Sequence, residues 1–168
     1  MDNFIYSINT TIPIFLVMVL GWALRQKGML NDNFVTVANK FNFKIYTSDG
    51  KTLTDEIDIL NVVSSTGALG ILAHHLPMVA ILEISHFNYK KNDVTYYFAI
   101  GGGVLNITHE GVTILADSFE AGNEIDYDRA EKAKQRAESK LSSSTNDLDY
   151  KKAEIALKKA INRLSMRQ

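Results

Sequence analysis

Basic side chains recur at helical spacing near the carboxyl end of the chain. Arg129, Lys132 and Arg136 stand at i, i+3 and i+7. Lys159 and Arg163 stand at i and i+4. Residues at these spacings lie on one face of a helix. If two such faces meet, their cations converge on a site that suits a polyphosphate, because charged donors bind phosphate oxygens strongly. The same pattern is typical of a solvated helix face, so charge alone leaves both interpretations open.

Other residue types that do chemistry give weaker patterns. The chain has no cysteine, which excludes a disulfide scaffold, a thiolate metal site and a cysteine nucleophile. His74 and His75 are adjacent, whereas ligands on one side of a strand are two residues apart, and on a helix three or four. We interpret this pair as loop residues. We predict no catalytic residue, no metal site and no required cofactor.

Three consecutive glycines, Gly101 to Gly103, raise the alternative of a phosphate-binding loop. Such a loop joins a strand to a helix whose amino terminus meets the phosphate. Here VLNIT follows the glycines and has the pattern of another strand. The glycines therefore predict a bulge or a close approach between strands.

The charge changes sign along the chain. The total of 18 basic and 19 acidic residues gives a net charge of −1, which excludes a chain that binds nucleic acid through its overall charge. Residues 1–43, 44–120 and 121–168 carry net charges of +1, −5 and +3. This asymmetry indicates parts with different partners.

Two helices are expected to position the basic residues. The first is predicted over Asp126 to Leu141 because acidic residues favour a helix amino terminus. SSSTNDLD then ends it, and Thr145 or Asn146 caps the next helix. Alanine-rich stripes stabilise a closed hairpin only weakly, so a ligand that prefers one form can shift the population. The stripes consist of Ala130, Ala133, Ala137 and Leu141, then Tyr150, Ala153, Leu157, Ala160 and Leu164.

The middle of the chain has the pattern of short strands. FKIYT and TLTDEIDILNVV flank Asp49-Gly50 and predict a hairpin. MVAILEI, VTYYFAI, VLNIT and VTILA follow, separated by turn residues rather than by helices. This spacing is typical of an antiparallel sandwich or barrel.

The first part of the chain holds the longest apolar run. The residues from Ile12 to Leu24 carry no charge, and extension back to Phe4 gives about the length that crosses a bilayer. Arg25 and Lys27 follow the run, unlike the pattern of a secretory signal. We predict a transmembrane helix over residues 4–24, with the rest of the chain in the cytoplasm. A buried amphipathic helix is the alternative.

The stretch SINTTIPIFLVMVLGWALRQKGMLNDNFVTVANKFNF resembles the beginning of the auxin efflux carrier family of permeases. The resemblance ends near Phe43. It implies a family with many spans, and a single span cannot enclose a pathway, so we expect no transport.

From about Phe43 to the end, the sequence resembles the epsilon subunit of F-type ATP synthases. The supporting segments are FKIYTSDGK, GALGILAHHLPMV, YYFAIGGGVLNI and VTILADSFE, and IDYDRA matches the family's IDxxRA signature. The resemblance implies a non-catalytic rotor subunit that contacts the gamma subunit and the c-ring. It further implies coupling of proton flow to ATP synthesis, and inhibition of ATP hydrolysis by a hairpin that meets the alpha and beta subunits when extended.

The same resemblance implies that the hairpin binds ATP as a regulatory ligand. Acidic residues are expected to face the base or sugar, and basic residues the phosphates. Lys159 stands where we expect arginine and keeps the charge without the bidentate fork. The implied nucleotide-binding residues are Glu120, Ile125, Asp126, Arg129, Arg136, Lys159 and Arg163.

A rotor-contact loop is implied by Gly70, His75 and Pro77. Ala68 stands where the family often has glutamate, which weakens the case for a charged contact there.

We therefore predict three parts: a carrier-like membrane segment over residues 1–43, a β-sandwich over 44–123, and a two-helix regulatory domain over 124–168. The fold class is mainly β plus α, with an antiparallel β-sandwich, a C-terminal α-helical hairpin and an N-terminal apolar transmembrane helix. The meeting of two resemblances predicts a chimera, and its first segment is expected to impair assembly or rotation.

The expected location is the cytoplasmic face of the bacterial cell membrane, where the chain is bound to the synthase and anchored by residues 4–24. No nucleic-acid partner is expected. Two alternatives stay open. One is a membrane-anchored fragment of an auxin-efflux-type permease with an incidental soluble tail. The other is a free-standing nucleotide sensor.

Overall fold

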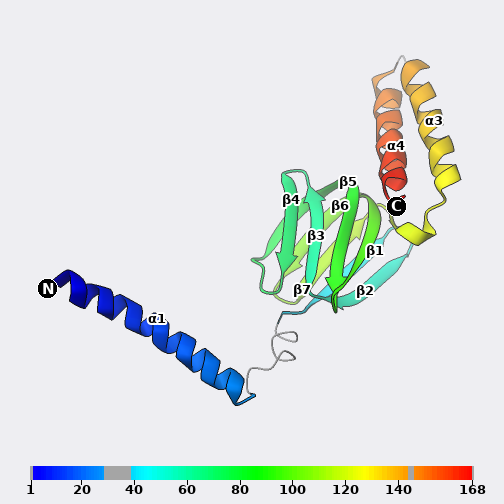
Figure 1. The fold of residues 1–168 in the computed structure, drawn as a ribbon. Coiled ribbons are helices and arrows are strands. Elements are labelled where there is room, and N and C mark those ends of the chain that lie inside the picture. The colour runs from blue at the N-terminus through cyan, green and yellow to red at the C-terminus, as the bar shows by residue number, and fades with distance from the viewer. Residues whose placement is uncertain (1, 29–38, 144–145, 168) are drawn as a thin grey trace. The chain divides into compact units, whose positions relative to one another are not determined.

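The computed structural model describes residues 2–28, 39–143 and 146–167, and the side chains of the first helix from Ile12 onward. The chain divides into two compact units, Met1–Asn39 and Lys40–Gln168. Figure 1 shows the helix of the first unit, and the strands and paired helices of the second.

The first unit contains helix α1 (Asp2–Gln26). Its apolar side chains are exposed, with Val17 at 69% and Trp22 at 64%. The predicted apolar helix is therefore present, but its predicted role as a membrane span and anchor is not supported. Within the residues that the structure describes, no helix is both long enough and apolar enough to cross a membrane. The uninterrupted apolar run, Ile12 to Leu24, is shorter than the about 20 residues that a span needs.

The second unit begins with a β-sandwich in which two long strands, β5 and β6, belong to both layers. β5 and β6 pair antiparallel along their lengths. Next to β6 the sheet continues through β7, β1 and β2, and next to β5 it continues through β3 and β4. The short strand β8 also pairs with β6. The strands are β1 (Phe41–Thr47), β2 (Thr52–Ile57), β3 (Ile59–Ser64), β4 (Gly67–Leu72), β5 (Met78–Lys91), β6 (Val94–Thr108), β7 (Gly111–Ala116) and β8 (Phe119–Ala121).

The strand pairings confirm the predicted hairpin and correct one detail. β1 and β2 pair antiparallel around a turn in which Gly50 has φ of +87°, a value that glycine adopts without a steric penalty. β1 pairs parallel with β7, however, so the sandwich is not antiparallel throughout. These two strands are far apart in sequence, and no hairpin turn dictates their direction.

Large side chains fill the space between the layers. Phe43, Phe87 and Phe98 are almost fully buried, and the Phe87 and Phe98 rings stack with centroids 5.0 Å apart. At Gly103, with φ of +152°, an added Cβ would collide with the carbonyl of Leu115 on β7. The predicted close approach between strands is therefore confirmed.

The chain ends in a helical pair. A short 3₁₀ turn η1 (Gly122–Glu124) leads into α3 (Tyr127–Ser143), and α4 is Asp147–Ser165. The Asn146 side chain caps α4 by accepting from the Leu148 N–H at 3.1 Å, as predicted. The buried side chains of the two helices are Ala130, Ala137, Ala153, Ala160 and Asn162. Tyr150 is 49% exposed, so its predicted place in the seam is wrong.

Candidate functional site

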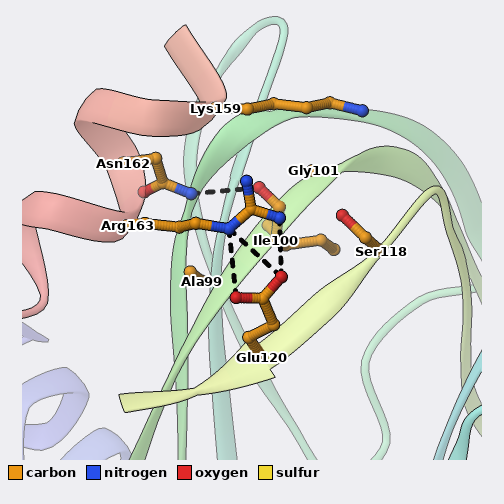
Figure 2. A pocket seen from close by; sticks show the side chains of 8 residues that line it. All are labelled: Ala99, Ile100, Gly101, Ser118, Glu120, Lys159, Asn162 and Arg163. Atoms are coloured by element: carbon orange, nitrogen blue, oxygen red, sulfur yellow. Dashed lines mark hydrogen bonds and ion pairs between the residues drawn. The ribbon is translucent and has the colours of Figure 1, made fainter. Parts of the chain in front are cut away.

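The last turns of α4 face the β-sandwich with three polar side chains. Lys159, Asn162 and Arg163 stand at i, i+3 and i+4, so the helix presents them on one side. Figure 2 shows Asn162 and Arg163 directed at β6 and β8, with Lys159 passing above Gly101. These side chains make the junction between the hairpin and the sandwich.

Arg163 is paired with Glu120 of β8. Its Nε lies 3.1 and 3.0 Å from the two carboxylate oxygens of Glu120, and its Nη2 lies 2.6 Å from Oε1 (Figure 2). Charge-assisted bonds in this forked geometry are stronger than neutral ones. Both side chains are about one-third exposed, at 31% and 30%. A residue predicted to bind phosphate is thus neutralised by a carboxylate of the protein.

Asn162 is the most buried polar contact of this junction. Its side chain is 9% exposed. Nδ2 donates to the carbonyl of Ser85 on β5 at 2.5 Å and to the carbonyl of Ile100 on β6 at 3.1 Å. Ser85 and Ile100 are direct partners in the β5–β6 pairing. One amide group therefore bridges two neighbouring strands.

Lys159 makes a looser contact with the segment between β7 and β8. Its Nζ lies 3.4 Å from Oδ2 of Asp117. A Cβ added to Gly101 would lie 3.3 Å from Cε and Nζ of Lys159 and would collide with Oγ of Ser118. The absence of a side chain at Gly101 leaves room for the lysine to cross β6.

The space enclosed by these side chains is very small. Its volume is about 10 Å³, roughly what one water molecule requires. A nucleotide does not fit between α4 and the sandwich unless Arg163 and Glu120 separate.

The other predicted nucleotide residues form a second group, just before α3 and along it. Asp126 caps this helix by accepting from the Arg129 N–H at 2.9 Å. Arg136 donates through Nε to the carbonyl of Lys132 at 3.2 Å. Ile125 is buried, at 7% exposure. A depression along α3 is lined by Asp126, Asp128, Arg129, Lys132, Gln135, Arg136 and Ser139.

The structure thus divides the seven predicted nucleotide residues, with Ile125 buried and the other six in two separate groups. Glu120, Lys159 and Arg163 line the junction. Asp126, Arg129 and Arg136 line the depression on α3. Sequence reasoning missed Asn162, although this lone asparagine, two residues after the seam alanine Ala160 in the last turns of the predicted helix, could have signalled a buried contact.

The link between sandwich and hairpin is fixed by Lys51, which sequence reasoning also missed. Its Nζ lies 2.6 Å from Oε2 of Glu124 and 4.7 Å from the centroid of the Phe119 ring. The Lys51 hydrogen bond is the main cause that lowers the pKa of Glu124. On the other side of the link, the Arg167 guanidinium lies 5.6 Å from the centroid of the Tyr127 ring.

The predicted rotor-contact residues lie on β4 and the turn after it. Gly70 pairs with Asn61 of β3. The His75 N–H donates to the carbonyl of Leu72 at 3.2 Å, and Pro77 immediately precedes β5. Leu76 between them is 79% exposed. Among the residues that the structure describes, no group of three or more His, Cys, Asp and Glu residues could hold a metal ion.

An apolar row crosses the outer face of the sandwich. Tyr46 pairs with Leu115, which pairs with Val104, which pairs with Ile81. These four side chains, on β1, β7, β6 and β5, are 38–64% exposed. Val79 adds a further side chain at 68% exposure. Contiguous exposed apolar side chains of this kind typically mark a contact with another protein.

Comparison with known proteins identifies the class to which this fold belongs. Residues 40–122 match the family model "ATP synthase, Delta/Epsilon chain, beta-sandwich domain". Residues 123–168 match "ATP synthase, Delta/Epsilon chain, long alpha-helix domain". The chain is 45% identical over 99 residues to the ATP synthase epsilon chain of Priestia megaterium, covering 59% of this chain and 74% of that one.

A second relative and the solved structures agree. The ATP synthase epsilon chain of Bacillus pumilus is 43% identical over 98 residues, covering 58% of this chain and 75% of that one. Similar folds occur in the Euglena gracilis mitochondrial ATP synthase (OSCP/F1/c-ring; TM-score 0.67, 20% identity, 77% and 82% covered). Another is in the Tetrahymena thermophila mitochondrial enzyme (central stalk/c-ring; TM-score 0.57, 12% identity, 77% and 97% covered).

The chain therefore belongs to the ATP synthase delta/epsilon family, and the predicted β-sandwich with a following helical pair is confirmed. Both matching models begin at or after residue 40. The predicted resemblance of residues 1–43 to auxin efflux carriers has no support from these comparisons. The alternative of a permease fragment with an incidental tail loses its basis.

Proposed function

We propose that this chain is the epsilon subunit in the central stalk of an F-type ATP synthase, where it acts without catalysing a reaction itself. The observation that carries this function is the uninterrupted match of residues 40–168 to both domains of the delta/epsilon family. Its work is to couple proton flow to ATP synthesis by joining the gamma subunit to the c-ring.

Two surfaces of the sandwich are suited to these partners. The apolar row of Tyr46, Leu115, Val104 and Ile81 offers exposed surface for a stable contact, and we assign it to the gamma subunit. The turn around His75, with Leu76 projecting into solvent, together with Gly70 and Pro77, forms the proposed contact with the c-ring. The subunit is thereby held at the cytoplasmic face of the bacterial cell membrane through the synthase rather than by α1.

The hairpin is proposed to restrain ATP hydrolysis. When extended, its basic helices meet the alpha and beta subunits, and when closed on the sandwich they do not. ATP is the proposed regulatory ligand that favours the closed form, held by the phosphate-facing cations Arg129, Arg136, Lys159 and Arg163. Support comes from the clustering of Lys159 and Arg163 at the junction and of Arg129 and Arg136 on α3.

Nucleotide binding of this kind requires an exchange of partners. Arg163 is paired with Glu120, and the enclosed space holds about one water. The phosphates must replace Glu120 on Arg163 while the hairpin stays near the sandwich. Glu120 and Asp126 are proposed to face the base or sugar.

Co-purification of the full chain tests the assembly. Expressed with gamma and c subunits, the tagged chain should retain both through gel filtration. A double substitution of the apolar row, Val104→Asp with Leu115→Asp, should release gamma, whereas Lys152→Asp on α4 should not. A chain that folds but never retains gamma would contradict the proposal.

A separate titration tests the ligand. Millimolar ATP should protect α3 and α4 amides from exchange, and Arg129→Ala with Arg163→Ala should remove that effect. Unchanged protection of the wild-type hairpin would refute ATP sensing and leave the assembly role standing.

A further inference from the structure

The junction contains two kinds of contact that differ in burial. Arg163 and Lys159 reach the carboxylates of Glu120 and Asp117 with long side chains, and remain 31% and 28% exposed. Asn162 is 9% exposed and donates its two side-chain hydrogen bonds to backbone carbonyls of the sandwich. Long exposed ion pairs tolerate movement and are weakened by salt. A short buried amide tolerates little movement and is little affected by salt, so it fixes the position of α4 more closely than the ion pairs do.

We propose that Asn162 is the positioning residue that fastens the carboxyl end of the hairpin to the β-sandwich without any nucleotide. It thereby sets how readily the hairpin detaches. The fastening itself is independent of the proposed function, and only its regulatory consequence rests on that function.

The chemistry of the side chain explains why an amide serves here. The Nδ2 group has two protons, and both are directed at carbonyl oxygens, those of Ser85 and Ile100. Carbonyl oxygens accept more than one hydrogen bond, so the strands gain this contact while remaining paired. A carboxylate at the same position would place its oxygens against two acceptors. An aliphatic side chain of similar size would fill the space without donating.

The neighbouring residues make the contact specific to this register of α4. Ala160 is 1% exposed and Ala153 is 3% exposed, and at 3.6 residues per turn both lie on the face of α4 opposite Asn162. At the end of α4, Cε of Met166 would lie 3.7 Å from a Cβ added at Gly122, in the η1 turn that links the sandwich to the hairpin. Rotation of α4 that moves Asn162 off the two carbonyls therefore also disturbs the seam and the linker end. The hairpin is expected to release as a unit.

A distance measurement on the full chain, without nucleotide, tests this inference. Because the chain has no cysteine, spin labels on Ser142→Cys and Glu110→Cys give one defined pair between the hairpin tip and the sandwich. Asn162→Asp and Asn162→Leu should each raise the ratio of detached to closed hairpin at least about tenfold, the effect of losing two buried hydrogen bonds. Amide protection of β1 and β7 should stay unchanged.

Gln135→Glu on the exposed face of α3 is the matched control, since it makes the same amide-to-carboxylate change away from the junction. It should leave the distance distribution as in the wild type. Wild-type distributions in both Asn162 variants would overturn the proposal, as would equal detachment in the control. If Asn162→Asp fails to fold, the apolar variant decides alone. Added ATP that leaves the wild-type distribution unchanged would instead count against nucleotide sensing and not against the fastening.

Discussion

The β-sandwich and the helical pair are held together by different means. The sandwich buries large side chains such as Phe43, Phe87 and Leu105 at 0–1% exposure. The helical pair buries four alanines and Asn162. Burial contributes roughly 25 cal/mol per Å² of apolar surface, so an alanine seam contributes far less than an aromatic core. One part is stable through its own core, and the other depends on contacts at one end.

This difference matches what each part is proposed to do. A subunit that transmits torque needs a rigid body between its partners, and the interlocked aromatic rings of the sandwich supply rigidity. A part that must extend and return needs a small free-energy difference between its states. The alanine seam and the polar junction supply that small difference.

Truncation of the sandwich core should have the largest effect. Phe87 stacks on Phe98 at 5.0 Å and meets Phe43 edge-on at 6.2 Å. Phe87→Ala leaves a cavity between the layers and should lower the free energy of unfolding by about 3–5 kcal/mol. Urea denaturation followed by fluorescence measures it. The control, Leu115→Ala on the exposed row, should change stability by about 0.5 kcal/mol or less. Equal losses would show that the two faces do not differ as described.

Alkaline pH should weaken the sandwich through one buried phenol. Burial, together with the charge of Asp55 and a contact with its Oδ2 at 3.4 Å, raises the pKa of Tyr89 to about 12. The unfolded chain releases this proton near pH 10 and the folded chain holds it, so stability falls as pH rises from 10 to 12. The contribution is up to about 1.4 kcal/mol per pH unit.

Tyr89→Phe isolates this contribution, since it removes the phenol and keeps the ring that stacks on Phe98. Denaturation midpoints between pH 9 and 12 should fall less steeply in the variant than in the wild type. Parallel curves for the two proteins would contradict the assignment.

Local sequence signals predicted much of this fold because local physics determines it. The spacing of Ala153 and Ala160 placed α4, and Asn146 marked its start, since capping and periodicity involve neighbouring residues. Gly103 signalled a close strand contact because only glycine fits there. Family resemblance supplied the sandwich that strand spacing alone left open.

Contacts between distant segments could not be predicted in this way. The parallel pairing of β1 with β7 joins two strands between which most of the sandwich lies in the sequence. The pairing of Arg163 with Glu120 depends on where α4 lands on the sheet. The prediction of a membrane span at residues 4–24 relied on the absence of charged residues and gave too little weight to the polar residues before Ile12.

The ion pair at the junction should matter less than the core. Arg163→Ala removes a forked pair that is about one-third exposed, so it should favour the detached hairpin by about 1 kcal/mol, or roughly fivefold. The spin-label distance between tip and sandwich measures it. In 1 M salt the wild type should move toward the variant, because screening weakens exposed pairs. Lys152→Ala, on exposed surface of the same helix, should leave the distance unchanged. A hairpin that stays closed in Arg163→Ala would mean that Asn162 and the seam suffice.

The contact of Lys51 with the link should have the smallest effect and should act on the segment between the two parts. Lys51 meets Glu124 at 2.6 Å, with side chains 40% and 51% exposed, and lies over the Phe119 ring. Exposed ion pairs contribute about 0–1 kcal/mol and a cation–π contact a similar amount. Lys51→Met keeps much of the apolar stem, so it should loosen residues 122–124 without unfolding the sandwich.

Amide exchange at Glu124 and Ile125 should rise a few-fold in Lys51→Met, while exchange in β1 and β7 stays at the wild-type rate. Lys44→Met, on the neighbouring strand and away from the link, serves as the control. Because the link joins a body that is stable by itself to a hairpin that is not, loosening it should also raise the detached fraction slightly. If the sandwich strands exchange faster instead, Lys51 belongs to the stability of the core, and the division between a rigid body and a releasable hairpin would have to be drawn after η1 rather than before it.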